Sequence, residues 1–445
     1  MSFKVKGNLE QALVELKNDK SNSVTVVLGQ SPVSPKTSEL KDVVFTLKAN
    51  YAIQDIECAA SSKILKGFKP SYNATVVQKL LEAGAIPAAQ VNCDELALGG
   101  TGTYSCNGLI RNPLDPKRLV GGSSSGSVAT LTDNIGFALG SDTGDSVRLP
   151  ASYNGKVGFK PSYGAISRFG LYAYASSLDT VAFFTHNVSD AVKVSQCTYG
   201  IDSKDFNTKK VGIQNVQKTK PQKVGVLKID NLNSQLSNAY QKLFKELSKE
   251  FKGDEIFEWV EVDEKILTAI KPVYDIISYS EASSNLSNLN GIAFGNRKDG
   301  ENWEQIMTNT RSQGFDKMVQ RRLTLGSFFL FASNQEELFL KAQKARRVIV
   351  EYLKSLHNKY DVLVFPASAD KAPLIDGTSP SYGFMDYILT GSNLGGNPSI
   401  SIPFTKVDGL PVNLALDAKL YADDKLLSYA LWFEEFLTKF NKKGE

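Results

Sequence analysis

Two short loops, built almost entirely from glycine and hydroxyl-bearing residues, lie between apolar segments in the first half of the chain. They span residues 121–127 and 140–146. A flexible linker has a similar composition, but linkers seldom lie between segments that have the pattern of buried structure. Loops that adjoin buried elements are where α/β enzymes usually keep their reactive groups. The pair of loops therefore predicts an α/β protein with a site at the place where the loops meet.

The segments around these loops alternate between strand-like and helix-like patterns. Short apolar, β-prone runs predict strands over residues 43–47, 86–91, 135–139, 224–227 and 362–366. Helical spacing of apolar residues marks 76–81, 240–251 and 335–356, and Asn73 and Gly84 are suited to cap the first of these helices. Such alternation predicts an α/β sheet with covering helices. Because strand-like runs resume after the polar stretch 203–224, we predict one domain over residues 1–445.

Composition excludes several classes of protein. The net charge of +4 arises from 51 basic and 47 acidic residues spread along the chain, which is not the footprint of a nucleic-acid-binding surface. Four cysteines without C-x-x-C spacing indicate a reducing compartment, and we predict no metal site. Of the two histidines, His357 lies in a Lys-rich helical segment and is expected to be exposed. No apolar run reaches the roughly 18 to 20 residues that cross a bilayer, so we expect a soluble protein without membrane insertion.

The second loop has features of a catalytic turn. A glycine-rich turn that leads into Ser146 can direct several backbone N–H groups at one point, as an oxyanion requires. A serine also needs a proton acceptor, and Lys48 ends the apolar run 43–47. A lysine can accept a proton only when it is neutral, which requires burial. Taken alone, the loop could be a structural turn and Lys48 a surface residue.

The two loops together form part of an ordered motif set. The block 121–127 precedes Gly140-Ser141-Asp142-Thr143-Gly144-Asp145-Ser146, and Lys160-Pro161-Ser162-Tyr163-Gly164 follows. In this order the chain resembles the amidase-signature family, whose Lys-Asp-Asn motif corresponds here to Lys48-Ala49-Asn50. The resemblance implies the amidase-signature fold, a central twisted mixed β-sheet covered by helices on both faces.

The resemblance also implies roles for individual residues. Ser146 would be the nucleophile, Lys48 the base and Ser123 the bridging serine, held by a cis peptide after Gly122. The backbone N–H groups of the second loop would form the oxyanion hole, namely those of Thr143, Gly144, Asp145 and Ser146. The catalytic core would cover about residues 43–200.

Within the family, the chain looks most like the A subunits of glutamyl-tRNA(Gln) and aspartyl-tRNA(Asn) amidotransferases. The segments that carry this likeness are 94–99, 168–179, 280–287, 310–325 and 393–401. The likeness implies a glutamine pocket within about residues 265–400. Arg322, or its neighbour Arg321, would bind the substrate carboxylate, Asp386 the ammonium, and Tyr274 would flank the pocket.

The implied function is hydrolysis of glutamine to supply ammonia for amidation of Glu-tRNA(Gln) or Asp-tRNA(Asn). The implied partners are a B subunit, which contacts most of the tRNA, and a small third subunit. This chain would need no cofactor of its own, whereas ATP and magnesium would belong to the partner. The expected location is the cytoplasm, or alternatively the mitochondrial matrix.

Two other functions fit the sequence. A stand-alone amidase that hydrolyses small amides would share the relay and differ in the pocket. A catalytically weakened structural subunit is suggested by Asp145 and Ala49, because the family usually has glycine and aspartate at these positions. Ser125 also departs from the family, since it replaces a glycine in the first loop.

Overall fold

The computed structural model describes residues 2–29 and 38–444. In this part of the chain, eleven strands form one sheet in the order β1-β3-β2-β4-β6-β5-β10-β11-β9-β7-β8. The strands are β1 Val24–Val27, β2 Val44–Lys48, β3 Ile86–Val91, β4 Phe137–Asp142, β5 Val157–Lys160, β6 Thr180–Thr185, β7 Lys223–Leu227, β8 Ile256–Val260, β9 Val362–Pro366, β10 Ser399–Val407 and β11 Leu410–Asp417. Parallel and antiparallel pairs both occur, so the sheet is mixed.

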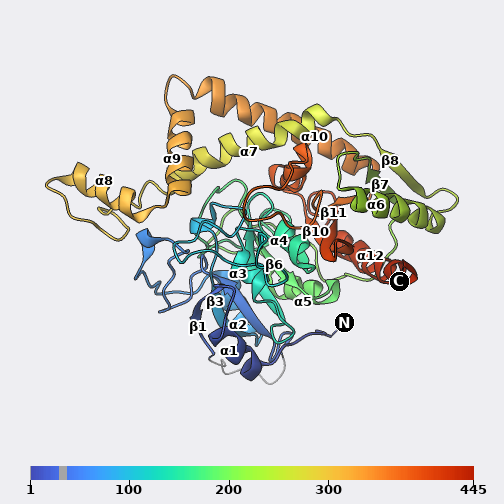
Figure 1. Ribbon diagram of the computed structural model, residues 1–445, viewed down its shortest axis with the longest axis horizontal. Helices are drawn as coiled ribbons and strands as arrows, with labels where there is room; N and C mark the ends of the chain where they lie inside the picture. The colour runs from blue at the N-terminus through green and yellow to red at the C-terminus, as the bar shows by residue number, and fades with distance from the viewer. Residues whose placement is uncertain (1, 30–37, 445) are drawn as a thin grey trace.

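Helices cover both faces of this sheet (Figure 1). The α-helices are α1 Leu9–Lys17, α2 Thr75–Glu82, α3 Ser125–Ala129, α4 Arg148–Asn154, α5 Val188–Thr198, α6 Ser234–Leu247, α7 Glu264–Asn285, α8 Trp303–Gly314, α9 Lys317–Leu330, α10 Lys341–Lys359, α11 Gly391–Gly395 and α12 Asp423–Gly444. The short helical turns are η1 Lys63–Leu65, η2 Glu95–Ala97, η3 Ser248–Glu250, η4 Glu336–Leu340 and η5 Gly383–Thr390. The predicted α/β architecture, with a central mixed sheet flanked by helices, is confirmed.

Side-chain alternation along β2 explains why both faces are covered. Phe45 and Leu47 pack into the apolar cluster that includes α2, α5, α6 and α12. Val44 points to the opposite cluster, which includes α1, α3 and α4. Successive side chains of a strand point to opposite faces, so a strand that is apolar at both needs helices on both. All five residues of β2 are buried, and Lys48 is the last of them.

A third apolar cluster joins α7, α9 and α10 into a helical layer on one side of the molecule (Figure 1). Ile270, Val273 and Ile277 of α7 pack there with Val319 and Leu323 of α9. These helices also carry Tyr274 and Arg322. This helical layer therefore brings two of the predicted pocket residues to the same side of the molecule.

None of the helices in the described ranges is long and apolar enough to cross a membrane.

Several local predictions were wrong. Asn73 does not cap α2: Ala74 occupies the N-cap position, and Asn73 Oδ1 accepts the N–H of Gln54 at 2.9 Å. Strand β4 extends to Asp142, so the second loop is shorter than its composition suggested. His357 is buried rather than exposed, because it lies with Ala342 and Ile349 on the inward face of α10.

Candidate active site

Lys48 ends strand β2, which is parallel to both of its neighbours, β3 and β4. Ligands of open α/β sheets bind beyond the carboxyl ends of the strands, where Lys48 lies. Its side chain is fully buried. The amine Nζ lies 2.7 Å from Ser123 Oγ, 3.1 Å from Ser124 Oγ and 2.9 Å from Ser141 Oγ. The amine of Lys48 thus joins the first loop to the end of β4.

The hydroxyl partners of this amine suit a neutral lysine. Ser124 Oγ donates its proton to the carbonyl of Ser141 at 3.1 Å, so it accepts from Lys48. Ser141 Oγ accepts from Asn50 Nδ2 at 3.1 Å and can accept from the amine as well. A neutral amine has two N–H groups and one lone pair. With the two N–H groups directed at Ser124 and Ser141, the lone pair is left for the hydroxyl proton of Ser123.

Burial lowers the pKa of Lys48 to about 8, and the negative charges of Asp94, Asp142 and Asp179 oppose this shift. Removing an ammonium from water favours its neutral form. A lysine with a pKa of about 8 is neutral in an appreciable fraction of molecules at physiological pH. The physical requirement for Lys48 to act as a base is therefore met.

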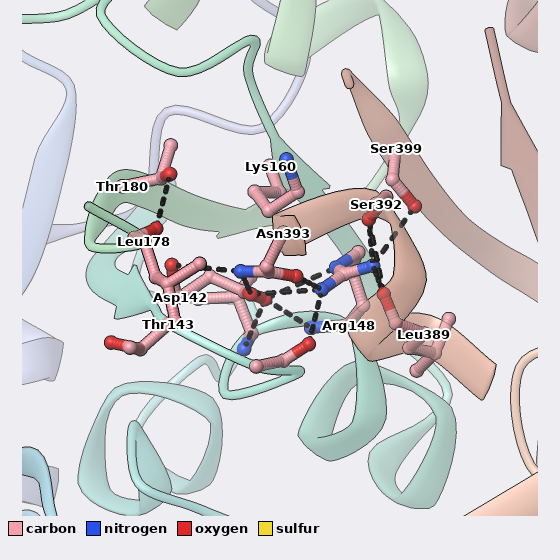
Figure 2. A network of polar contacts seen from close by, with 12 residues as sticks. Asp142, Thr143, Arg148, Lys160, Leu178, Thr180, Leu389, Ser392, Asn393 and Ser399 are labelled. Atoms are coloured by element: carbon pink, nitrogen blue, oxygen red, sulfur yellow. Dashed lines mark hydrogen bonds and ion pairs between the residues drawn. The ribbon is translucent and has the colours of Figure 1, made fainter. Parts of the chain in front are cut away.

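A buried ion pair holds the turn that carries Ser146 (Figure 2). Arg148 Nη2 lies 2.8 Å from Asp142 Oδ1, and Arg148 Nε lies 3.1 Å from Asp142 Oδ2. Both side chains are fully buried. Burial alone would raise the pKa of Asp142, but the charge and hydrogen bonds of Arg148 outweigh it and hold the pKa below its usual value. Arg148 also donates to the carbonyl of Gly144 at 2.8 Å, which fixes the middle of the turn.

A second set of contacts anchors this turn to the C-terminal half of the chain. Asn393 Nδ2 donates to both the carbonyl and the carboxylate of Asp142, at 3.2 Å and 2.9 Å. Arg148 Nη1 donates to Ser392 Oγ and to the Leu389 carbonyl, each at 2.7 Å. Figure 2 shows these groups converging on the guanidinium. The geometry of the turn therefore depends on residues some 250 positions away.

The backbone N–H groups of the turn are available to a ligand. Within the described residues, none of the N–H groups of Thr143, Gly144, Asp145 and Ser146 donates a hydrogen bond to another residue. The Ser146 hydroxyl is likewise without a hydrogen bond in this part of the chain, although Ser146 is only 5 % exposed. Unpaired donors in a buried turn are costly unless a ligand uses them. An oxyanion is the ligand that such a cluster of donors stabilises.

The first loop lies directly against this turn. The N–H of Ser124 donates to the carbonyl of Ser146 at 3.3 Å, and the peptide bond between Gly122 and Ser123 is cis. The buried carboxylate of Asp94 fills the space beside Gly122, where a β-carbon would collide with it. Asp94 also accepts the N–H groups of Thr101 and Gly102, at 3.1 Å each. Only glycine fits at position 122.

A cavity of about 690 Å³ opens next to the turn and is lined by Gly144 and Asp145. Arg322, Asp386 and Tyr274 line the same cavity. Tyr274 packs on the turn itself, since a β-carbon added at Gly144 would lie 3.0 Å from its ring. Ser146 directly follows Asp145 in sequence and is not itself among the lining residues.

The structure distinguishes the two neighbouring arginines of α9. Arg321 is exposed, whereas Arg322 lines the cavity and donates from Nη1 to Tyr174 Oη at 3.2 Å. Its guanidinium also lies over the ring of Tyr279, 5.1 Å from the centroid. Arg322 Nε is buried and has no hydrogen-bond partner within the described residues. Asp386 is exposed, and its carboxylate accepts the Ser381 hydroxyl at 2.6 Å.

Sequence reasoning missed the groups that hold the reactive residues in place. These are Ser124, Ser141, Asn50, Asp142, Arg148 and Asn393. Asp142 and Arg148 stand six positions apart across the turn, and such a pair of opposite charges in an otherwise small, buried loop was a detectable signal. Nothing in the sequence alone connects either of them with Asn393.

Comparison with known proteins agrees with this geometry. The sequence model of the Amidase family matches residues 11–427. The chain belongs to the amidase family. Among similar proteins is the A subunit of the glutamyl-tRNA(Gln) amidotransferase from a Nitratiruptor species, which is 37% identical over 405 residues, 89% of this chain and 90% of that protein. The corresponding A subunit from Mycoplasma genitalium is 36% identical over 432 residues, 93% of this chain and 90% of that protein.

Solved structures place this amidase in the same fold. The A subunit of the glutamyl-tRNA(Gln) amidotransferase from Thermotoga maritima superimposes with a TM-score of 0.79 at 29% identity, covering 98% of this chain and 96% of that one. A peptide amidase from Stenotrophomonas maltophilia gives a TM-score of 0.79 at 22% identity, covering 97% of this chain and 92% of that one. The expected amidase-signature fold is therefore confirmed.

We predict that the reactivity of Ser146 follows the charge of Lys48. The rate of labelling of Ser146 by a fluorophosphonate should rise with pH and level off above an apparent pKa of about 8, because the neutral amine is the base. Lys48→Arg, which stays charged at every accessible pH, should label at a low rate throughout. The exposed Lys354 provides the control, since Lys354→Arg should leave the profile unchanged. An unaltered profile in Lys48→Arg would exclude Lys48 as the base.

A second prediction concerns the buried ion pair. Asp142→Asn leaves the guanidinium of Arg148 buried without its counter-charge, and we expect a loss of roughly 3–5 kcal/mol in the free energy of unfolding. Glu351→Gln removes an exposed ion pair with Lys354 and should cost about 1 kcal/mol or less. Chemical denaturation monitored by tryptophan fluorescence measures both. Equal losses in the two variants would show that the pair does not hold the turn.

Proposed function

We propose that this amidase is the glutamine-hydrolysing A subunit of a tRNA-dependent amidotransferase, and that it supplies ammonia for conversion of Glu-tRNA(Gln) or Asp-tRNA(Asn) to the amidated form. The observation that carries the proposal is the pairing of a buried Lys48–Ser123 contact with a cavity that holds an arginine without a carboxylate partner among the described residues. The relatives named as A subunits of glutamyl-tRNA(Gln) amidotransferase support it over most of the chain.

In the proposed mechanism, Ser146 Oγ attacks the side-chain amide carbon of glutamine. Its proton passes to Ser123 Oγ, whose own proton moves to the neutral amine of Lys48. The negatively charged oxygen of the tetrahedral intermediate accepts hydrogen bonds from the backbone N–H groups of the turn 143–146. The relay then protonates the leaving nitrogen, ammonia departs, and an ester of Ser146 remains. Water activated by the same relay hydrolyses this ester to glutamate and restores the serine.

The cavity supports glutamine as the substrate. A free amino acid carries a carboxylate, and a planar guanidinium binds a carboxylate through two parallel hydrogen bonds. Arg322 is a cavity-lining arginine with an unused buried N–H, at Nε, within the described part of the chain. Tyr274 packs on the oxyanion turn and lines the cavity with Arg322, so its ring would help to set the distance between the carboxylate and the reacting amide. The sequence-based assignment of Asp386 to the ammonium remains a prediction.

The proposal places the remaining chemistry in partner subunits. A B subunit would bind most of the tRNA and would hold ATP and magnesium, and a small third subunit would contact both chains. This chain would need no cofactor for amide hydrolysis, because the relay and the oxyanion turn supply the proton transfer and the charge stabilisation. Such a complex would work where aminoacyl-tRNA is made, in the cytoplasm or in the mitochondrial matrix.

A stand-alone amidase acting on small amides is the second candidate. It would share the relay and the oxyanion turn with the first candidate, and a structure described as an amidase is among the similar folds, at 26% identity and a TM-score of 0.78. The two candidates differ in what Arg322 does. A hydrolase of uncharged amides has no use for a guanidinium without a carboxylate partner in its substrate cavity.

Replacement of the nucleophile should separate catalysis from assembly. Ser146→Ala should lower ammonia release from glutamine on the order of 10⁶-fold, the scale expected when the nucleophilic serine of a relay is removed. Assembly with the B subunit should persist. Ser125→Ala, in the first loop, removes a hydroxyl that has no hydrogen-bond partner among the described residues and should retain activity. Undiminished glutaminase activity of Ser146→Ala would refute the mechanism, and absence of phosphonate labelling in the wild type would favour a catalytically weakened structural role.

Replacement of the pocket arginine should separate the two candidate functions. Arg322→Gln should raise the KM for glutamine about 10- to 100-fold with little change in kcat, since hydrogen bonds to a charged group contribute about 1.5–3 kcal/mol. Hydrolysis of butyramide, which has no carboxylate, should not change. Arg321→Gln is the matched control, because Arg321 is exposed beside the same helix turn. If Arg322→Gln leaves the KM for glutamine unchanged, the stand-alone amidase becomes the better interpretation.

A further inference from the structure

We infer that Asp179 is a positioning residue, which holds the oxyanion turn and Arg322 at a fixed distance from each other. The inference rests on the proposed hydrolysis of glutamine and adds to it a residue that is not among those lining the substrate cavity. Asp179 is buried, and each of its two carboxylate oxygens accepts hydrogen bonds from a different part of the site.

The pairing of β4 with β6 places Asp179 beside the oxyanion turn. These strands are antiparallel, and Asp142, the last residue of β4, is paired with Thr180, the first residue of β6. Thr143 follows β4 and Asp179 precedes β6, so the two residues meet at the end of the same pair of strands. Thr143 Oγ1 donates to Asp179 Oδ1 at 2.7 Å, and both residues are buried.

This hydrogen bond holds the start of the turn. Within the described part of the chain, the backbone N–H groups of residues 143–146 donate to no other residue, so they do not hold the turn in place. Arg148 holds the carbonyl of Gly144 in the middle of the turn. The Thr143 hydroxyl supplies the corresponding contact at the first residue. A displacement of about 1 Å between reacting groups can slow catalysis about 100-fold, so this contact matters for the rate.

The other carboxylate oxygen holds the segment that precedes β6. Asp179 Oδ2 accepts the N–H groups of Tyr174 and Ala175, at 2.9 Å and 3.0 Å. The Tyr174 hydroxyl accepts from Arg322 Nη1 at 3.2 Å and donates to Ser278 Oγ at 3.0 Å. Tyr174 and Ser278 are both buried, which shields these contacts from water. A continuous series of hydrogen bonds therefore runs from the oxyanion turn through Asp179 to Arg322.

The charge of Asp179 suits this double role. Burial raises the pKa of Asp179 to about 6, and its three hydrogen-bond donors oppose the rise together with the charge of Arg168. The carboxylate is therefore mostly ionised at neutral pH. An ionised carboxylate accepts at both oxygens, so that one side chain can serve the turn and the segment 174–175 at once.

The two connections act on different ends of the proposed substrate. The amide of glutamine would lie at the oxyanion turn and its carboxylate at Arg322, and the reacting carbon meets Ser146 only if both ends are correctly placed. Loss of the hydroxyl of Thr143 should disturb the reacting end alone. Loss of the hydroxyl of Tyr174 should disturb the carboxylate end alone. Removal of the Asp179 carboxylate should disturb both ends.

Three variants of the full chain test this separation. Thr143→Val, which is close to threonine in shape and lacks the hydroxyl, should lower kcat about 10- to 100-fold on glutamine and on butyramide alike, with little change in KM. Tyr174→Phe should raise the KM for glutamine about tenfold and leave hydrolysis of butyramide unchanged. Asp179→Ala should show both changes together. In the Arg322→Gln background, Tyr174→Phe should add nothing, because the tyrosine acts through the arginine.

Two controls distinguish positioning from a general loss of stability. Thr143→Ser keeps the hydroxyl and should keep most of the wild-type kcat. Asp190→Ala removes another buried carboxylate that accepts two backbone N–H groups, those of Lys4 and Val5, and that lies outside the substrate cavity. Asp190→Ala should lower the free energy of unfolding and leave kcat and KM unchanged well below the unfolding temperature.

Each failure has its own signature. If Thr143→Val hydrolyses butyramide at the wild-type rate, Asp179 does not position the turn and the inference is overturned. If Arg322→Gln raises the KM for glutamine and Tyr174→Phe does not, the connection to Arg322 has no effect and the inference is likewise overturned. If the wild type hydrolyses butyramide but not glutamine, the proposed function fails, and the inference fails with it whatever Thr143→Val does.

Discussion

The ion pair between Asp142 and Arg148 is the interaction on which the rest of the site depends. It is fully buried, and it closes the turn between β4 and α4 that carries both the free N–H groups and Ser146. A buried pair of charges gains little net stability over an apolar pair of the same size, because desolvation offsets much of the attraction. Its value here is geometric. Arg148 reaches Asp142, the carbonyl of Gly144 and the segment 389–399 at once, so the turn is fixed from both halves of the chain.

Burial also lowers the pKa of Lys48, as the proposed role of this residue as a base requires. The end of β2 lies in a region without solvent, where an ammonium is disfavoured and its pKa falls to about 8. The negative charges of Asp94, Asp142 and Asp179 oppose this fall in the pKa, so the amine can still be protonated near neutral pH. The balance leaves an amine that can take a proton and return it within the same pH range. A relay of two serines and a lysine needs both properties, because the first step removes a proton that the leaving group later requires.

The sequence pointed to Lys48 and the two serine loops more directly than to the groups that hold them in place, and the reason is physical. Lys48 and the serine loops are recognisable because a run of apolar residues ending in a lysine, and small residues between buried segments, are local patterns. Arg148 also donates hydrogen bonds to groups at residues 389–399, and no local sequence pattern connects segments that far apart. Asn73 was assigned to a cap that Ala74 holds, since the contact that decides it comes from Gln54 in another loop. His357 could have been placed correctly, because Ala342, Ile349 and His357 recur at helical spacing on one face of α10 despite its many lysines.

The candidate catalytic groups and most of the substrate cavity come from different elements of the fold. Lys48, Ser123 and Ser146 lie on β2 and the two loops, whereas much of the cavity wall comes from α7, α9, η5 and the segment 367–382. Changes in those elements alter the pocket without moving Lys48 or Ser123. Asp145 differs from them, because it belongs to the catalytic turn and to the cavity wall at once. A substitution at position 145 therefore alters the cavity wall and the turn that carries Ser146 together.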